Sequence, residues 1–366
     1  MATKTARKPS TKPEPRDVAQ EITNKMIKAL EAGTVPWHKE WHSAEGDMPT
    51  SLATGKQYRG GNIVALWVES MLCGYTSKWW GTYGQMAARA GLINVAEPGK
   101  REIWVSPTLP DGTKDTTPRG VRRGEKGTPI VRWLSFTVRT DRDGNPLPID
   151  PKTGKQKVNT IRVPRVWLVY NADQCSFPED CKGVPQPEPR GEGFDPIKEA
   201  EDILTHYMDA EGAPTLAHGG DRAFYRPSTD HIQMPEFADF TTAEAYYSTL
   251  YHECTHSTGA SRPGRVNKGQ GRPGIKDGDF SFFGDQKYSF EELVAEMGAA
   301  FMCAHAGIEQ KALFDNSANY IAHWLGKLRS DKNLIIQAGI QAQRAVDVML
   351  GTEFAPDEEN DEEEVA

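Results

Sequence analysis

The stretch Tyr251-His252-Glu253-Cys254-Thr255-His256 is an H-E-x-x-H sequence that lies late in a segment with helical character. We expect this helix to begin at Thr241, because Thr241 and the glutamate three residues later have the spacing of a capping box. We expect it to end at Gly259, since glycine commonly follows a helix C-terminus. On such a helix His252 and His256 lie one turn apart on one face, where both imidazoles can bind one metal ion.

The residue after the first histidine suits the chemistry of such a site. On the predicted helix the carboxylate of Glu253 would lie beside the ion, where it can accept a proton from a bound water. We therefore predict Zn²⁺ (or another divalent metal) held by His252 and His256, with Glu253 as the general base. Cys254 would point roughly the opposite way, which favours a place in the core.

A catalytic zinc site needs a third protein ligand. The metzincin continuation H-E-x-x-H-x-x-G-x-x-H is excluded, because Arg262 stands where the last histidine would be. A later predicted helix places Glu292 and Glu296 on a face of small residues. We favour Glu292 as the ligand and Glu296 as the group that orients a ligand histidine. Alternatively, Glu292 completes a capping box with Ser289, and Glu296 is the ligand.

The last helical segments, residues 318–328 and 334–350, add candidates for stabilising charge on a substrate. Tyr320 or His323 could donate a hydrogen bond to a developing oxyanion. Packing in the core is the more common role for a tyrosine at such spacing.

Charge divides the chain into two parts. Residues 1–180 contain 27 Lys and Arg against 19 Asp and Glu, whereas the remainder contains 16 against 32. This asymmetry indicates a polyanion-binding module joined to a module of another kind. The clearest boundary is the Pro-rich linker at residues 183–193. We expect a disordered basic arm at residues 1–16 and a disordered acidic tail at residues 353–366.

The predicted fold class is α+β, in two domains. The first domain, residues 17–182, combines helices with strands near residues 103–105, 130–138 and 163–169. The second domain, residues 194–352, is mostly helical, with a small β-hairpin ahead of the motif helix.

Cysteine usage and hydropathy bear on the compartment. The five cysteines are scattered and form no C-x-x-C pair, which argues against a disulfide scaffold and favours a reducing cytoplasm. No apolar run approaches the length of about 18 residues that a transmembrane helix needs, and the N-terminus lacks the apolar region of a signal peptide. We expect neither membrane insertion nor secretion.

Aromatic and basic residues occur together in several glycine-containing loops of the first half. A single-stranded nucleic acid site needs both kinds, because cations contact the phosphates and flat side chains stack on the bases. The candidates for this role are Trp37, Trp41, Tyr58, Arg59, Trp79, Trp80, Arg122, Arg123 and Lys126. The alternative for each aromatic residue is an ordinary place in the core.

Several motifs together resemble the ArdC-type antirestriction proteins of conjugative plasmids and phages. In the first half they occupy residues 32–37, 54–60, 123–129 and 170–175. In the second half they occupy residues 246–256, which run into the H-E-x-x-H sequence, and residues 291–296. The resemblance covers most of residues 17–350.

The resemblance implies an N-terminal domain that binds single-stranded DNA and a C-terminal zincin-like metallopeptidase domain. It also implies protection of incoming plasmid or phage DNA from host restriction in the cytoplasm of a bacterial cell. Two alternatives stay open. The protein is a DNA-shielding module with a structural or vestigial zinc site, or it is an effector metallopeptidase that cleaves a host protein. The protein substrate itself is not identified by the sequence.

Overall fold

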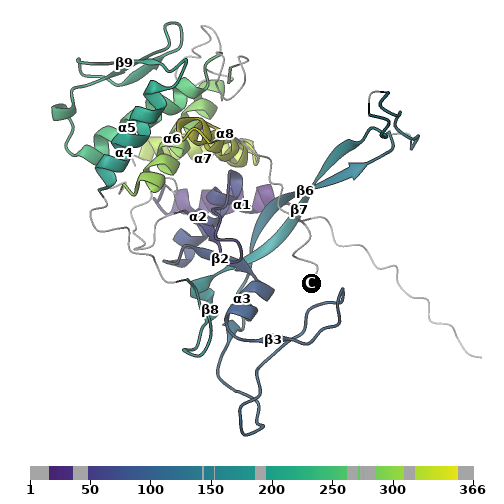
Figure 1. Ribbon diagram of the computed structural model, residues 1–366. Coiled ribbons are helices and arrows are strands. Elements are labelled where there is room, and N and C mark those ends of the chain that lie inside the picture. The colour runs from purple at the N-terminus through teal and green to yellow at the C-terminus, as the bar shows by residue number, and fades with distance from the viewer. Residues whose placement is uncertain are drawn as a thin grey trace, which may run out of the picture.

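The computed structural model describes residues 16–35, 48–141, 144–151, 153–185, 195–261, 271–272, 275, 286–308 and 318–352 (Figure 1). The predicted acidic tail, most of the predicted linker and all but the last residue of the predicted basic arm lie outside these ranges. The architecture is α+β, as expected from the sequence.

Three helices belong to the first half of the chain: α1 (Val18–Glu31), α2 (Gly61–Cys73) and α3 (Tyr83–Arg89). Helix α1 begins after Asp17, whose side chain accepts a hydrogen bond from the backbone of Gln20 at 3.0 Å. Helix α3 begins after Thr82 in a complete capping box.

A four-stranded sheet runs beside these helices, in the order β1-β2-β7-β6. Its strands are β1 (Thr50–Ser51), β2 (Trp79–Thr82), β6 (Thr128–Val138) and β7 (Asn159–Asn171). The strands expected near residues 130–138 and 163–169 are therefore confirmed, and both are longer than predicted. Two small ribbons complete this half: β3 (Ile93–Asn94) with β4 (Trp104–Val105), and β5 (Gly120–Val121) with β8 (Cys175–Ser176).

The second half is mostly helical, with α4 (Pro196–Asp209), α5 (Ala243–Thr258), α6 (Gln286–Ala306), α7 (Ala318–Ser330) and α8 (Leu334–Met349). The expected hairpin is present as β10 (Phe224–Arg226) and β11 (His231–Met234). A strand that we did not predict, β9 (Thr215–His218), pairs in parallel with β11. No helix in the described ranges is both long and apolar enough to cross a membrane.

The main hydrophobic core contains residues from both halves of the chain. Helix α8 packs against both α6 and α2. The contact with α2 is close, because a Cβ at Gly61 would lie 2.8 Å from Cγ2 of Ile336. At its edge Arg59 forms an ion pair with the buried carboxylate of Asp347 at 2.5 Å. The two halves therefore share one core.

Candidate metal centre

The H-E-x-x-H sequence lies on α5, as predicted. Thr242, not Thr241, caps this helix, and its hydroxyl accepts a hydrogen bond from the backbone of Ala245 at 3.2 Å. The helix thus begins one residue later than predicted, and Ala245, three residues after Thr242, cannot complete the predicted capping box. Gly259 ends the helix, as predicted, in a right-handed conformation with φ −81°. The space it leaves is filled by Arg272, whose Cζ would lie 2.8 Å from a Cβ at this position.

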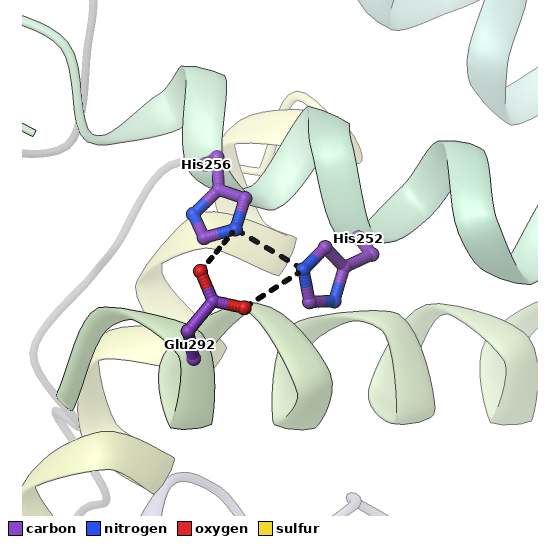
Figure 2. A group of neighbouring side chains, drawn as sticks. All are labelled: His252, His256 and Glu292. Atoms are coloured by element: carbon purple, nitrogen blue, oxygen red, sulfur yellow. Dashed lines mark hydrogen bonds and ion pairs between the residues drawn. The ribbon is translucent and has the colours of Figure 1, made fainter. Parts of the chain in front are cut away.

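Three side chains converge between α5 and α6 (Figure 2). The Nε2 atoms of His252 and His256 are 3.1 Å apart. Glu292 reaches toward both rings. Its Oε2 atom is 3.5 Å from Nε2 of His252, and its Oε1 atom is 3.5 Å from Nε2 of His256. Two nitrogens bound to one tetrahedral Zn²⁺ are about 3.3 Å apart, because each Zn–N bond is about 2.0–2.1 Å long. The triangle therefore has the size of a ligand set for one metal ion.

Helix α6 begins at Gln286, three residues before Ser289, so Ser289 lies inside the helix. The capping box that would have given Glu292 a purely structural role is therefore absent. Glu296 is buried one turn further along α6 and lies outside the group of three. The geometry favours Glu292 over Glu296 as the third ligand.

Close packing of α5 on α6 depends on a small residue. A Cβ at Gly298 would lie 2.4 Å from Oγ1 of Thr255, which follows Glu253 by two positions on α5. The helices can approach this closely only because Gly298 has no side chain, and this approach brings Glu292 to the histidines.

His256 is oriented by a residue that we did not single out from the sequence. Its Nδ1 atom is 3.1 Å from the carboxylate of Glu291, which leaves Nε2 to face the other two candidate ligands. We expected Glu296 in this orienting role. At His256 Glu291 takes this place, and Glu296 stays a candidate for orienting His252, whose pKa its charge helps to raise.

Glu291 is held in turn by Arg272, whose side chain is fully buried. The guanidinium donates to both carboxylate oxygens, at 2.6 and 2.9 Å, and to the backbone oxygen of Thr255 at 2.6 Å. Burial by itself would raise the pKa of Glu291, but Arg272 and His256 hold that pKa below its usual value. No signal in the sequence marked Arg272, because it lies in a glycine-rich segment without hydrophobic periodicity.

The charges around His252 favour a cation. Burial lowers the pKa of this imidazole, but the hydrogen bond to Glu292 and the charges of Glu253, Glu292 and Glu296 outweigh it and raise the pKa to about 9. Glu253 itself is buried, with 8% of its surface exposed. The negative charges that raise this pKa also favour a metal cation, which would bind His252 in place of its proton.

The two candidate oxyanion donors lie on α7, but only one side chain falls within the described part of the structure. His323 is exposed on this helix. Partial burial and the charge of Lys327 lower the pKa of His323, and the charge of Glu296 opposes that shift. For Tyr320 the structure describes only the backbone.

The described stacking candidates form no exposed aromatic surface. Trp79 and Trp80 are 8% and 1% exposed and belong to two core clusters, so the expectation that they offer stacking surfaces was wrong. Tyr58 is half-buried against the core. Trp37 and Trp41 lie outside the described residues.

The basic candidates separate into two places. Arg59 pairs with Asp347 in the contact between the halves of the chain. Arg122 donates to the backbone oxygens of Asp173 and Cys175 and also pairs with Glu125, so part of its role is structural. The exposed side chains that follow, Arg123 and Lys126, stay candidates for phosphate contacts.

Comparisons with known families divide the chain as its charge does. Residues 16–170 match the model of the N-terminal domain of the anti-restriction factor ArdC. Residues 202–341 match the model of a zincin-like metallopeptidase.

Comparisons with individual proteins extend over nearly the whole chain. An uncharacterised protein of Sinorhizobium fredii, y4eC, is 32% identical over 349 residues, which is 94% of each chain. The DNA primase TraC of Escherichia coli is 32% identical over 346 residues, but the chain spans only 27% of that primase.

Two solved structures share the fold. The crystal structure of the antirestriction ArdC protein from the R388 plasmid, in its metal-free form, is 31% identical with a TM-score of 0.59 and covers 91% of this chain and 97% of its own. A Mn(II)-bound form of the same protein gives the same identity and TM-score and covers 92% and 98%.

Proposed function

The chain belongs to the ArdC family of antirestriction proteins, and on that premise we propose that it protects incoming DNA from restriction. In this proposal the first half binds single-stranded DNA, and the second half hydrolyses a peptide bond at a divalent metal site. The observation that carries the second part is the triangle of His252, His256 and Glu292.

The donor set fits a catalytic zinc ion. Two imidazoles and one carboxylate are the protein ligands of a known class of zinc peptidase sites, in which the fourth position is left to water. Manganese also accepts nitrogen and oxygen ligands, and one relative has been solved with Mn(II). We propose Zn²⁺, and analysis of the bound metal distinguishes the two.

Glu253 is the proposed proton carrier. A divalent ion at the site would lower the pKa of a coordinated water and polarise a substrate carbonyl. Glu253 follows a ligand directly on α5, so its carboxylate can accept the proton of the attacking water and deliver it to the leaving amine. Tyr320 and His323 stay candidates for a hydrogen bond to the oxyanion.

Metal analysis and two substitutions test the catalytic half. The purified full-length protein should contain about one metal ion per chain, and His256→Ala should remove it. Glu253→Gln should keep both the metal and the fold but abolish cleavage of any substrate found by comparing host proteins with and without the active protein. A metal content unchanged by His256→Ala would refute the proposed site.

Binding of labelled oligodeoxythymidylate tests the DNA half. Affinity should fall steeply as salt rises, because phosphate contacts release counterions. It should also exceed the affinity for duplex DNA of the same length, because stacking requires accessible bases. Equal or stronger binding of the duplex would contradict a single-strand site.

A second candidate function has support from the packing. The candidate ligands connect α5 to α6, and these helices form the centre of the main core, so a metal there would also stabilise the fold. In that case the protein shields DNA and the site is structural. If Glu253→Gln leaves protection against restriction intact in cells, shielding is the function and hydrolysis is not required.

A further inference from the structure

Strands β6 and β7 extend beyond the rest of their sheet. They pair along the whole of β6, from Thr128 opposite Val169 to Val138 opposite Asn159. Strand β2 covers only the end of β7, from Val169 to Asn171. Beyond Val131, which bonds to Asn62 of α2, residues 132–138 and 159–165 form a two-stranded ribbon that projects away from the helices (Figure 1). We call it the β6–β7 ribbon.

Large apolar side chains are exposed on this ribbon. Trp133 is 59% exposed, Phe136 46% and Ile161 47%. A two-stranded ribbon is only marginally stable by itself, and exposed apolar surface of this kind commonly marks a binding site. The ribbon is therefore suited to contact a partner.

The charge of the ribbon indicates the chemistry of that partner. Every charged residue in β6 and β7 is an arginine (Arg132, Arg162 and Arg165), and neither strand contains an acidic residue. Arg132 and Arg165 lie directly opposite each other, so two positive charges occupy one cross-strand position of the ribbon. Such a surface is complementary to a polyanion.

One face of the ribbon combines two of these arginines with an aromatic residue, whereas position 162, opposite Ser135, lies on the face of Trp133. Because cross-strand partners and alternate residues share a face, Arg132, Arg165, Phe136 and Ile161 lie on one face, and Trp133 lies on the other. The guanidinium of Arg132 lies over the ring of Trp167, 5.6 Å from its centroid, which helps to orient it. We call this the arginine face.

We propose that the arginine face of the β6–β7 ribbon is a contact surface for single-stranded nucleic acid. Arg132 and Arg165 contact phosphates, and Phe136 stacks on a base. This inference rests on the single-stranded DNA binding proposed above and gives that binding a location that the loop residues considered earlier do not include.

A second copy of the chain is a weaker fit to this surface. Proline has no N–H to donate, so Pro164 interrupts the donors of β7 and disfavours addition of another strand at its free edge. On β6 the backbone of Val131 is already occupied, because both its N–H and its oxygen bond to the side chain of Asn62 at 2.9 Å. Facing arginines on two copies would also repel each other.

Binding of fluorescein-labelled oligodeoxythymidylate to full-length variants tests the proposal. Phe136→Ala should weaken binding by roughly tenfold, the scale of one lost stack, and Phe136→Tyr should restore it. Arg132→Ala and Arg165→Ala should each reduce the slope of log affinity against log salt by about 0.7. Trp133→Ala, on the opposite face, and Arg101→Ala, an exposed cation outside the ribbon, are the matched controls and should bind as the unaltered protein does.

Each outcome decides something definite. If the unaltered protein binds the oligonucleotide and the arginine-face variants bind equally well, the ribbon proposal is overturned while the proposed function stands. If Trp133→Ala weakens binding as much as Phe136→Ala, the assignment of the face is wrong. If the variants change only the sedimentation of the protein, the ribbon is a surface for self-association. If the unaltered protein does not bind, the DNA half of the proposed function fails first.

Discussion

Glu291 and Arg272 are 19 positions apart in the sequence and form a buried ion pair, with their closest atoms 2.6 Å apart. The same carboxylate contacts Nδ1 of His256, on the side of the ring away from Glu292. The orientation of a candidate metal ligand is thus tied to a buried charge on another segment of the chain.

We predict that Glu291→Gln weakens metal binding by about 10–100-fold, because the carboxylate that orients His256 is lost. The substitution also leaves Arg272 buried without its anion, so the free energy of unfolding should fall by about 3–5 kcal/mol. Competition with a fluorescent chelator measures the first effect and denaturant unfolding measures the second. Metal affinity equal to that of the unaltered protein would show that Glu291 does not support the ligand.

We predict that Gly298→Ala destabilises the protein by about 1–3 kcal/mol, because the new methyl group would overlap Thr255 and push α5 away from α6. Metal affinity should fall with it, since Glu292 moves with α6. The matched control is Gly326→Ala on α7, where a Cβ meets no atom within 4 Å. That control should be neutral or stabilise by about 0.5–1 kcal/mol, since alanine favours a helix. If Gly298→Ala left the free energy of unfolding and the metal affinity unchanged, the close packing of α5 on α6 would be contradicted.

We predict that both halves of the chain unfold in one transition, because α8 packs on α2 as well as on α6. The exposed residue Trp133 and the buried Trp324 provide tryptophan positions, one in each half, for single-tryptophan variants. The denaturant concentrations at the midpoints of unfolding, followed by the fluorescence of each single tryptophan, should coincide. Two separated transitions would show that the halves are independent despite the contact between α8 and α2.

We predict that the contribution of Asp115 to the stability of the first half depends on pH. The Thr117 hydroxyl and backbone, with Arg119, lower the pKa of Asp115 to about 2. A carboxylate with a lowered pKa stabilises the fold fully above its unfolded pKa of about 3.9, and this contribution is lost as the pH falls toward 2. The stability difference between the unaltered protein and Asp115→Asn should therefore be constant above about pH 4 and shrink below it.

Denaturant unfolding at a series of pH values measures that difference. Asp111→Asn is the comparison, because hydrogen bonds from Thr113 also lower the pKa of Asp111 but no arginine among the described residues contacts it, so its stability difference should change less with pH. A difference for Asp115→Asn that persists unchanged to pH 2 would contradict the prediction.

Local patterns predicted the elements well. The long strands β6 and β7, the hairpin of β10 and β11 and the motif helix α5 were all expected from signals between residues close in sequence. Errors of one to three residues occurred at the starts of α5 and α6, where more than one residue could cap the helix. The error at the start of α6 affected the site, because it suggested that Glu292 forms a capping box with Ser289 instead of binding a metal.

Neighbouring residues in the sequence did not reveal which tryptophans are buried and which are exposed. Trp79 and Trp80 stand next to a lysine in a glycine-containing segment, a pattern that suits a nucleic-acid surface as well as a core. Their burial follows from the pairing of β2 with β7, two strands far apart in the chain. Conversely, Trp133 appeared to be an ordinary strand residue and is exposed, because nothing in the described structure covers the β6–β7 ribbon.

The sequence by itself determined the spacing of His252 and His256, the place of Glu253 beside them, the α+β class and the opposite charges of the two halves. These are properties of neighbouring residues, and helix geometry converts them directly into positions in space. Only the tertiary structure favoured Glu292, assigned the orienting role to Glu291 and Arg272, and joined the halves through α8. Those relationships depend on which helix faces pack together, and an apolar face indicates only that it will be buried, not against which partner.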